Sequence, residues 1–196
     1  MSDTILLCKA GHSCMSLESL LSRKRSAILK RWCNAILETY PSDTAHFLRS
    51  QKNRFTNPVG QTIAEETERV FDDLIRGAEA LEASRFLDNI IRIRAVQEFP
   101  PSQALSFIFD LKKAVRDELA GELLDGGMAA QLEAFESSID SLMLHAFDGY
   151  MKCREKIFEI RTEETRRMTR SLIRMANLNR EVADQDSGND NSDKTP

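Results

Sequence analysis

The sequence predicts an all-α protein, a single helical bundle that closes with a long, projecting C-terminal helix. From Ser16 onward, apolar residues recur at intervals of three and four, which places them on one face of successive α-helices. No stretch alternates apolar and polar residues for long enough to indicate a β-strand. Glycine and proline number only 8 and 5 among 196 residues, so long helices can run without breaks.

Proline and serine delimit the first two predicted helices. The first helix runs from Ser16 and ends before Pro41, because proline cannot continue a helix. Ser42 can cap a short second helix by accepting a hydrogen bond from a free backbone amide. The inward-facing pair of this second helix is predicted to be Phe47 and Leu48.

Two further helices follow a loop. Thr62 and Glu65 have the spacing of a capping box, so the third helix is predicted to begin near residue 61 and to end at Gly77. The fourth helix covers residues 79–97 and stops at a pair of prolines.

The last two predicted helices are a fifth helix after the prolines and a very long sixth one. The fifth begins near Ser102 and carries an apolar stripe that ends at Leu119. After a double glycine, the sixth extends from Met128 to Leu178 without a proline. Its first half has a broad apolar face that belongs to the bundle, and its second half narrows to a charged stalk.

Composition excludes several classes of protein. The formal net charge is −4, with 27 basic and 31 acidic residues, so bulk charge does not suit the chain to coating nucleic acid. No stretch reaches the roughly 18 uncharged apolar residues of a membrane span, and the N-terminal residues lack the features of an export signal. The four scattered cysteines favour free thiols in a reducing compartment. We therefore expect a cytoplasmic protein.

No pattern of residues predicts catalysis or a metal site. The three histidines, His12, His46 and His145, lie far apart without a carboxylate or second histidine at helical spacing. Cys8, His12 and Cys14 cluster near the N-terminus, but a structural zinc site normally needs a fourth ligand, and terminal residues are usually unpinned. We expect a protein that is not an enzyme and that requires no cofactor and no metal.

Two arginine patterns point to charge-dependent contacts. Arg92 and Arg94 interrupt an apolar run, and residues two apart on a helix point about 160° from each other, so one face cannot bury both. One of them is expected either to form a buried carboxylate pair or anion site, or to bury only its stem beneath a solvated guanidinium. Arg166, Arg170 and Arg174 are stacked at four-residue intervals, where like charges repel unless water or an anionic partner compensates them.

Several short motifs, in one order along the chain, resemble those of a known family. They are Arg31-Trp32, Thr39-Tyr40-Pro41, Asn53 to Gly60, Ile90 to Gln97, Pro101 to Ala104, and Tyr150 to Lys156. Together they resemble the N-terminal domain of the RsbT co-antagonist proteins of the RsbRD type, over residues 17–165. In two departures from the family, no STAS output domain follows here, and Pro100 stands where the family usually has a helix-opening serine.

The resemblance implies a globin-like helical sensory domain that needs no haem and that usually signals through its last helix to an output domain in stress responses. We therefore expect residues 1–15 to form a flexible arm, 16–165 a globin-like sensor domain, 166–182 a helical stalk and 183–196 a disordered acidic tail. As a free-standing member without a STAS domain, the chain is expected to regulate a separate protein partner.

The predicted sites are a ligand pocket and a contact stripe on the stalk. If a signal molecule binds, its pocket is expected beneath the fifth and sixth helices, among Phe107, Ile108, Leu111, Met143 and Phe147. A fully packed core is the alternative there. Dimerisation and partner contact are expected along the long helix, through Tyr150, Cys153, Ile157, Ile160, Arg166, Arg170 and Arg174.

Three other functions stay open as alternatives. The chain is also similar to accessory proteins of an anaerobic redox complex. A haem sensor that uses His145 or His46, or a thiol sensor that uses Cys153, is a second possibility. Binding of nucleic acid through the arginine stripe is a third possibility, which the net charge of −4 makes us not expect and which a steep salt dependence of binding would reveal.

Overall fold

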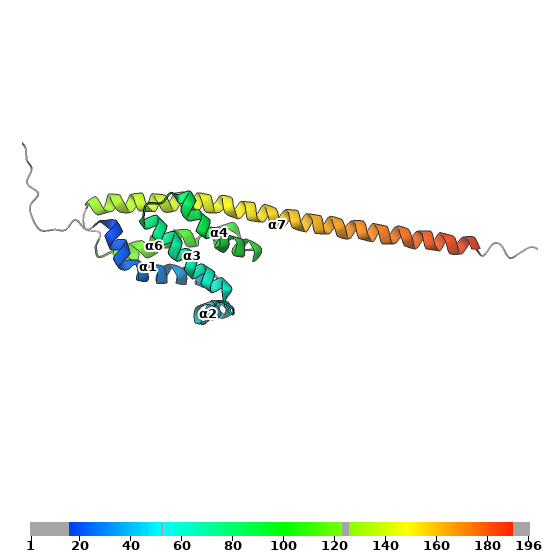
Figure 1. Ribbon diagram of the computed structural model, residues 1–196, viewed down its shortest axis with the longest axis horizontal. Coiled ribbons are helices and arrows are strands. Elements are labelled where there is room, and N and C mark those ends of the chain that lie inside the picture. The colour runs from blue at the N-terminus through cyan, green and yellow to red at the C-terminus, as the bar shows by residue number, and fades with distance from the viewer. Residues whose placement is uncertain (1–15, 52, 123–125, 190–196) are drawn as a thin grey trace, which may run out of the picture. The chain divides into compact units, whose positions relative to one another are not determined.

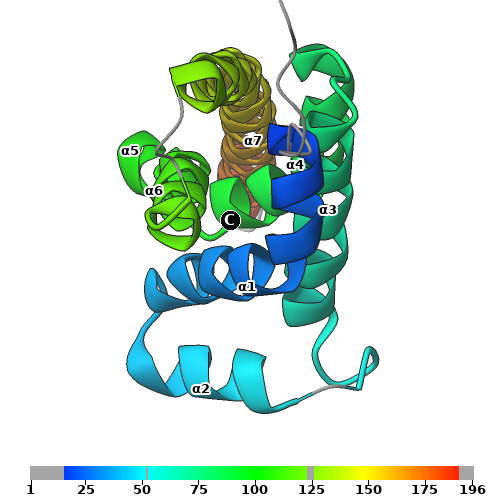
Figure 2. The same cartoon turned by 90° about the vertical axis from the view of Figure 1, so that its left-hand side faces the viewer.

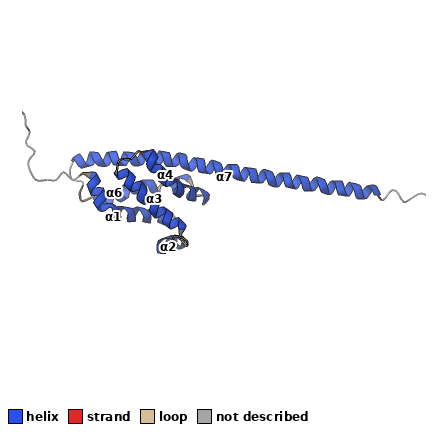
Figure 3. Cartoon of the chain, in the orientation of Figure 1, coloured by secondary structure: helices blue, strands red, loops and turns tan. Residues whose placement is uncertain are grey.

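All the regular secondary structure in the described part of the chain is α-helical, as predicted. The computed structural model describes residues 16–51, 53–122 and 126–189, and within these ranges it contains seven α-helices and no strand (Figures 1 and 3). The helices are α1 (Leu17–Glu38), α2 (Ser42–Ser50), α3 (Pro58–Ile75), α4 (Ala80–Val96), α5 (Pro101–Leu105), α6 (Phe107–Leu119) and α7 (Gly126–Asn189). The chain divides into two units, residues 1–151 and 152–196. A globin-like arrangement of the helices stays a prediction.

The first unit is organised around α1. This helix contacts α6 on one side and α3 on the other, while α3 also packs along α4 (Figure 2). The Trp32 side chain of α1 is fully buried, and its Nε1 donates a hydrogen bond to Phe107 O at 2.7 Å. The indole also stacks on the Phe107 ring, with centroids 6.3 Å apart. A buried tryptophan with its one donor satisfied fixes α1 against the start of α6.

Ion pairs between helices surround this core. Arg31 of α1 bonds Glu118 of α6 at 2.8 Å, and Arg116 of α6 forms a two-bond contact with Glu136 of α7 at 2.5 and 2.6 Å. The paired carboxylates raise the pKa of the Arg31 and Arg116 guanidinium groups. In both pairs the arginine side chain is at least half exposed, so each pair contributes only modest stability, but together they fix the register of neighbouring helices.

Helix α3 begins earlier than the sequence predicts. Its N-cap is Asn57, whose side chain accepts from Gly60 N at 2.9 Å and donates to Leu48 O and Gln51 O at 2.8 Å each. Thr62, the predicted cap, lies inside the helix, where its hydroxyl donates to Pro58 O. The prediction was wrong because proline is well suited to the first helical position, so the Asn-Pro pair starts the helix.

Three other boundaries and one core residue also differ from the predictions. The N-cap of α2 is Pro41, and Ser42 is the first residue inside the helix. The Phe47 side chain is 46% exposed, because Ala45 and Leu48 face inward instead. The predicted fifth helix is divided at Ser106 into α5 and α6. Helix α7 continues to Asn189, into the segment predicted to be disordered; the predicted flexible arm, residues 1–15, lies outside the described residues.

The second unit is the remainder of α7, beginning at Lys152. Every side chain from Glu164 to Arg180 is exposed. The exposed large apolar residues of this unit are Phe158, Ile160, Met168, Leu172, Ile173, Met175 and Leu178. None of the helices described here can span a membrane.

Candidate functional site

Arg94, at the end of α4, is a fully buried cation. One terminal nitrogen donates to Ile36 O at 3.1 Å and to Thr39 Oγ1 at 2.7 Å, at the C-terminal end of α1. The other donates to Gln103 O at 3.0 Å and Ala104 O at 3.3 Å, on α5. The Nε atom is buried without a hydrogen-bond partner. The guanidinium therefore joins three helix ends, and carbonyl groups at a helix C-terminus are favourable neighbours for a cation.

Aromatic rings complete the surroundings of Arg94. Its Cζ atom lies 5.5, 5.2 and 5.0 Å from the ring centroids of Tyr40, Phe99 and Phe107. Burial lowers the pKa of Arg94, and burial raises the pKa of Tyr40. No described carboxylate forms an ion pair with Arg94 and its guanidinium is not solvated, so both the buried carboxylate pair and the solvated guanidinium are wrong for this residue: neutral oxygens and ring faces surround the charge instead. Arg92 is exposed.

A shallow hollow of about 580 Å³ lies at the chain corners next to this cluster. Tyr40 and Pro41 line it from the α1–α2 corner, and Glu98 and Pro100 line it from the α4–α5 corner. Glu98 adopts a left-handed backbone conformation with φ of 61°, which is uncommon for a residue with a side chain. The Glu98 carboxylate and the C-terminal ends of α1 and α4 bring negative charge to the rim, while the buried Arg94 nearby is positive. The hollow therefore favours neither an anionic nor a cationic ligand.

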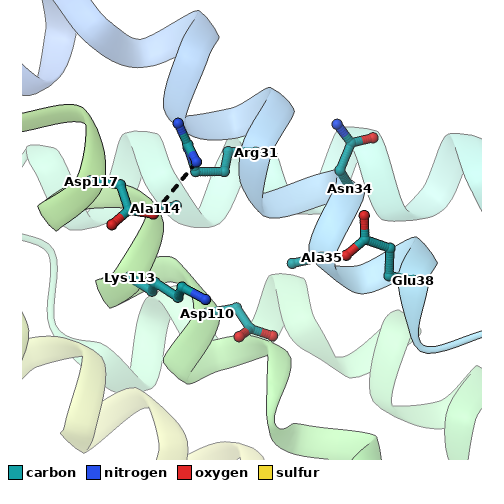
Figure 4. Close-up of a pocket in the computed structure, with 8 residues that line it drawn as sticks. All are labelled: Arg31, Asn34, Ala35, Glu38, Asp110, Lys113, Ala114 and Asp117. Carbon is teal, nitrogen blue, oxygen red and sulfur yellow. Dashed lines mark hydrogen bonds and ion pairs between the residues drawn. The ribbon is translucent and has the colours of Figure 1, made fainter.

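A second hollow, of about 400 Å³, lies between α1 and α6 (Figure 4). Arg31 crosses it to Asp117 at 3.4 Å, while Lys113 and Asp110 line it from α6 and Glu38 lines it from α1. Charges of both signs occupy its walls, and few apolar side chains are present. The groove is suited to water and surface ion pairs and does not define a ligand class.

The five residues of the predicted ligand pocket do not line either hollow. Phe107, Ile108 and Leu111 are completely buried on the inner face of α6, and Met143 is half-buried on α7. Phe147 was expected in the core, but its side chain is 45% exposed, because α7 turns Ala146 and Tyr150 inward instead. Binding of a signal molecule among these residues stays a prediction.

An exposed apolar face on α7 was missed by the sequence analysis. Leu144, Phe147 and Met151 are 70%, 45% and 39% exposed and are spaced by three and four residues, which places them on one side of the helix. This is the a-d-a spacing of a coiled-coil seam. The spacing is visible in the sequence, but the sequence analysis predicts that the broad apolar face of this part of the helix belongs to the bundle.

Helix α6 extends this face. Helices α6 and α7 run antiparallel, as two ion pairs show: Lys112 bonds Asp140 at 2.5 Å, and Arg116, one turn later on α6, bonds Glu136, one turn earlier on α7. The same register brings Phe109, which is 47% exposed, to the level of Leu144, and its position three residues before Lys112 places it on the side of α6 that faces α7. We call Phe109, Leu144, Phe147 and Met151 the α6–α7 apolar face.

The predicted contact stripe on the long helix is only partly exposed. Tyr150 is 2% exposed and donates its hydroxyl proton to Phe99 O at 2.6 Å, so it belongs to the core and not to a contact surface. Cys153 and Ile157 are half-buried, and Ile160 is 50% exposed. Arg166, Arg170 and Arg174 are exposed, and no described carboxylate pairs with them. Their contact with a partner stays a prediction.

The remaining titratable candidates are dispersed. His46 is exposed on α2 and His145 is half-buried on α7. The Cys33 sulfur lies 3.1 Å from Thr67 Oγ1, and burial raises the pKa of its thiol. Among the described residues, no group of three His, Cys, Asp or Glu side chains is arranged to hold a metal ion. The Cys8–His12–Cys14 cluster lies outside the described residues.

The fold and surfaces define the class of protein: an all-α domain with an unpartnered apolar helix face, typical of proteins that act through contacts with other macromolecules. The chain belongs to the family described as the RsbT co-antagonist protein rsbRD N-terminal domain, which matches residues 26–165. It is also similar to an uncharacterized protein of Archaeoglobus fulgidus, with 27% identity over 146 residues that cover 71% of this chain and 83% of the relative. No solved structure matches the chain.

Proposed function

We propose that this chain is a non-enzymatic, cytoplasmic sensory or regulatory protein that acts by binding a protein partner. Membership of a family named for its place in the RsbT regulatory system supports this proposal. Binding to another protein, and not catalysis, is consistent with the exposed apolar face, with the separate positions of His46 and His145, and with the half-buried thiol of Cys33.

The first part of the proposal is a homodimer. The single observation that carries it is the α6–α7 apolar face, because three large side chains at coiled-coil spacing on one helix cost free energy when water covers them. In the second unit, Cys153, Ile157 and Ile160 provide apolar side chains at the same kind of spacing. Residues 152–165 contain four basic and four acidic side chains, so two copies of this segment can lie together without net repulsion.

Light scattering after size-exclusion chromatography tests the dimer. We expect the wild-type chain to be dimeric at a concentration of about 100 µM, where dissociation constants below that value give mostly complex. Leu144→Asp with Phe147→Asp should give a monomer, because each carboxylate would be buried without a partner. Phe55→Asp is the matched control, since Phe55 is 96% exposed elsewhere in the first unit. A monomeric wild-type chain would remove this part of the proposal.

The second part of the proposal is signalling through the long helix to a separate protein. Capture experiments from the native host, comparing the full chain with one truncated after Glu159, test it. Partners retained only by the full chain support transmission through the last helix. Recovery of the same partners by both chains would assign partner binding to the residues up to Glu159 and would contradict transmission through the rest of the helix.

A further inference from the structure

The helix of the second unit has two halves of different charge. Residues 152–165 have four basic and four acidic side chains, whereas residues 166–180 contain five arginines, no lysine, no aspartate and no glutamate. Two ion pairs compensate charges toward the first half: Lys156 with Glu159 at 3.0 Å and Arg167 with Glu163 at 3.4 Å. The described residues offer no such pair to Arg166, Arg170 or Arg174.

The arginine-rich half is also amphipathic. With a turn of about 100° per residue, Arg166, Arg167, Arg170 and Arg174 fall within one arc of the helix. Met168, Leu172 and Met175 lie on the other side, about 150° away on average. Their side chains are 70%, 66% and 59% exposed, whereas two large apolar residues, Ile173 and Leu178, lie nearer the arginine side. The arginine arc therefore lacks an anionic partner among the described residues, and the apolar arc lacks an apolar one.

Two possible binding partners, a second copy of the segment and a nucleic acid, would each cover one arc of the helix and leave the other arc without a partner. A second copy of the same segment would cover the apolar arc but would leave the arginines of both copies, five from each, without an anionic partner. Like charges of this density repel. A nucleic acid would neutralise the arginines but would leave Met168, Leu172 and Met175 in water.

We propose that residues 166–178 dock on the surface of a bilayer that contains anionic phospholipid, with the helix lying in the plane of the interface. Met168, Leu172 and Met175 enter the acyl boundary, and the arginines contact lipid phosphate groups. The guanidinium fork bonds phosphate in a bidentate manner, which fits a segment in which every basic residue is arginine. Such a helix lies on the membrane and does not cross it, in agreement with the lack of a spanning helix among those described. This inference goes beyond the proposed function and does not depend on the dimer.

Vesicle sedimentation with the full-length chain tests the proposal. We expect binding to vesicles of phosphatidylglycerol and phosphatidylcholine in equal parts, and much weaker binding to pure phosphatidylcholine. The binding should fall as salt is raised from about 50 to 500 mM, because ions screen the attraction.

Variants separate the two arcs. Arg166→Gln with Arg170→Gln and Arg174→Gln should lower the partition coefficient about a hundredfold, since each arginine near an anionic surface contributes about fivefold. Leu172→Ser with Met175→Ser should lower it at least tenfold, because less apolar surface enters the bilayer. The matched control is Lys152→Gln with Lys156→Gln in the balanced half, which should stay within about twofold of wild type. Circular dichroism checks that each variant keeps its helix content.

A fluorescent reporter gives an independent readout of depth. Leu172→Trp should shift its emission to the blue when anionic vesicles are added, whereas Arg170→Trp, on the opposite arc, should not. Absence of binding to the anionic vesicles at low salt overturns the proposal. Binding that the Leu172→Ser, Met175→Ser variant leaves unchanged also overturns it, because the arginines alone would then hold the segment to the anionic surface. Equal or tighter binding to duplex DNA at the higher salt indicates a nucleic acid instead.

Discussion

Arg94 is the residue whose replacement should affect the first unit most. Removing its guanidinium takes one donor each from the Thr39 hydroxyl and from three helix-end carbonyls, and leaves three ring faces without their cation. We expect Arg94→Met to lower the free energy of unfolding by about 3 kcal/mol, the cost of unsatisfied buried polar groups next to a lost charged hydrogen bond. Urea unfolding followed by circular dichroism measures the change.

The control for Arg94→Met is Arg92→Met, two residues earlier on the same helix. Arg92 is exposed, so we expect its replacement to change the unfolding free energy by less than about 0.5 kcal/mol. Similar losses in both variants would contradict the role given to Arg94. From the sequence, the spacing of the two arginines shows that one face cannot bury both. It does not show which one is buried, because the acceptors come from Ile36 and Gln103, on other helices.

At the scale of an element, Asn57 determines where α3 begins. Its side chain caps the helix through Gly60 N and also donates to two carbonyls at the end of α2. A Cβ atom at residue 60 would collide with the Asn57 side chain, so glycine is required there for the cap to close. We expect Asn57→Ala to lower the unfolding free energy by about 2 kcal/mol, measured by urea denaturation.

Thr62→Ala is the matched comparison, because Thr62 holds the capping position that the sequence predicts. In the structure its hydroxyl bonds only to Pro58 O within the helix, so the loss should stay below about 0.5 kcal/mol. A larger loss for Thr62→Ala than for Asn57→Ala would restore the predicted helix start. Two signals of comparable strength, a capping box and an Asn-Pro pair, compete in the sequence, and only the contacts with α2 decide between them.

Periodicity nevertheless predicts most of the helices and the all-α class. It fails at Ser106, where the apolar spacing of Leu105, Ile108 and Leu111 continues across the break between α5 and α6. It also fails on α7, where Phe147 and Tyr150 both fit an apolar stripe but only Tyr150 is buried. A helix that is apolar over more than half its circumference does not indicate which part other helices will cover. The exposed α6–α7 apolar face could for that reason not be assigned from the sequence.

At the scale of the whole molecule, the two units should contribute very differently to stability. Every side chain from Glu164 to Arg180 is exposed, so this part of the second unit adds almost no buried apolar surface within a single chain. Its helix is therefore maintained by local hydrogen bonds and by whatever binds it. The first unit, in contrast, holds its core up to Tyr150.

Two truncations test this division of stability. A chain that ends at Glu159 keeps Tyr150 and its hydrogen bond to Phe99 O, and we expect its free energy of unfolding to stay within about 1 kcal/mol of the full chain. A chain that ends at Asp148 loses that buried ring, and we expect a decrease of about 3 kcal/mol. Urea denaturation measures the unfolding free energy of the full chain and the two truncated chains. The protein concentration is chosen so that light scattering gives the same oligomeric state for all three. Equal stability of the two truncated chains would show that Tyr150 does not close the core, and a large loss on ending at Glu159 would show that the second unit supports the first.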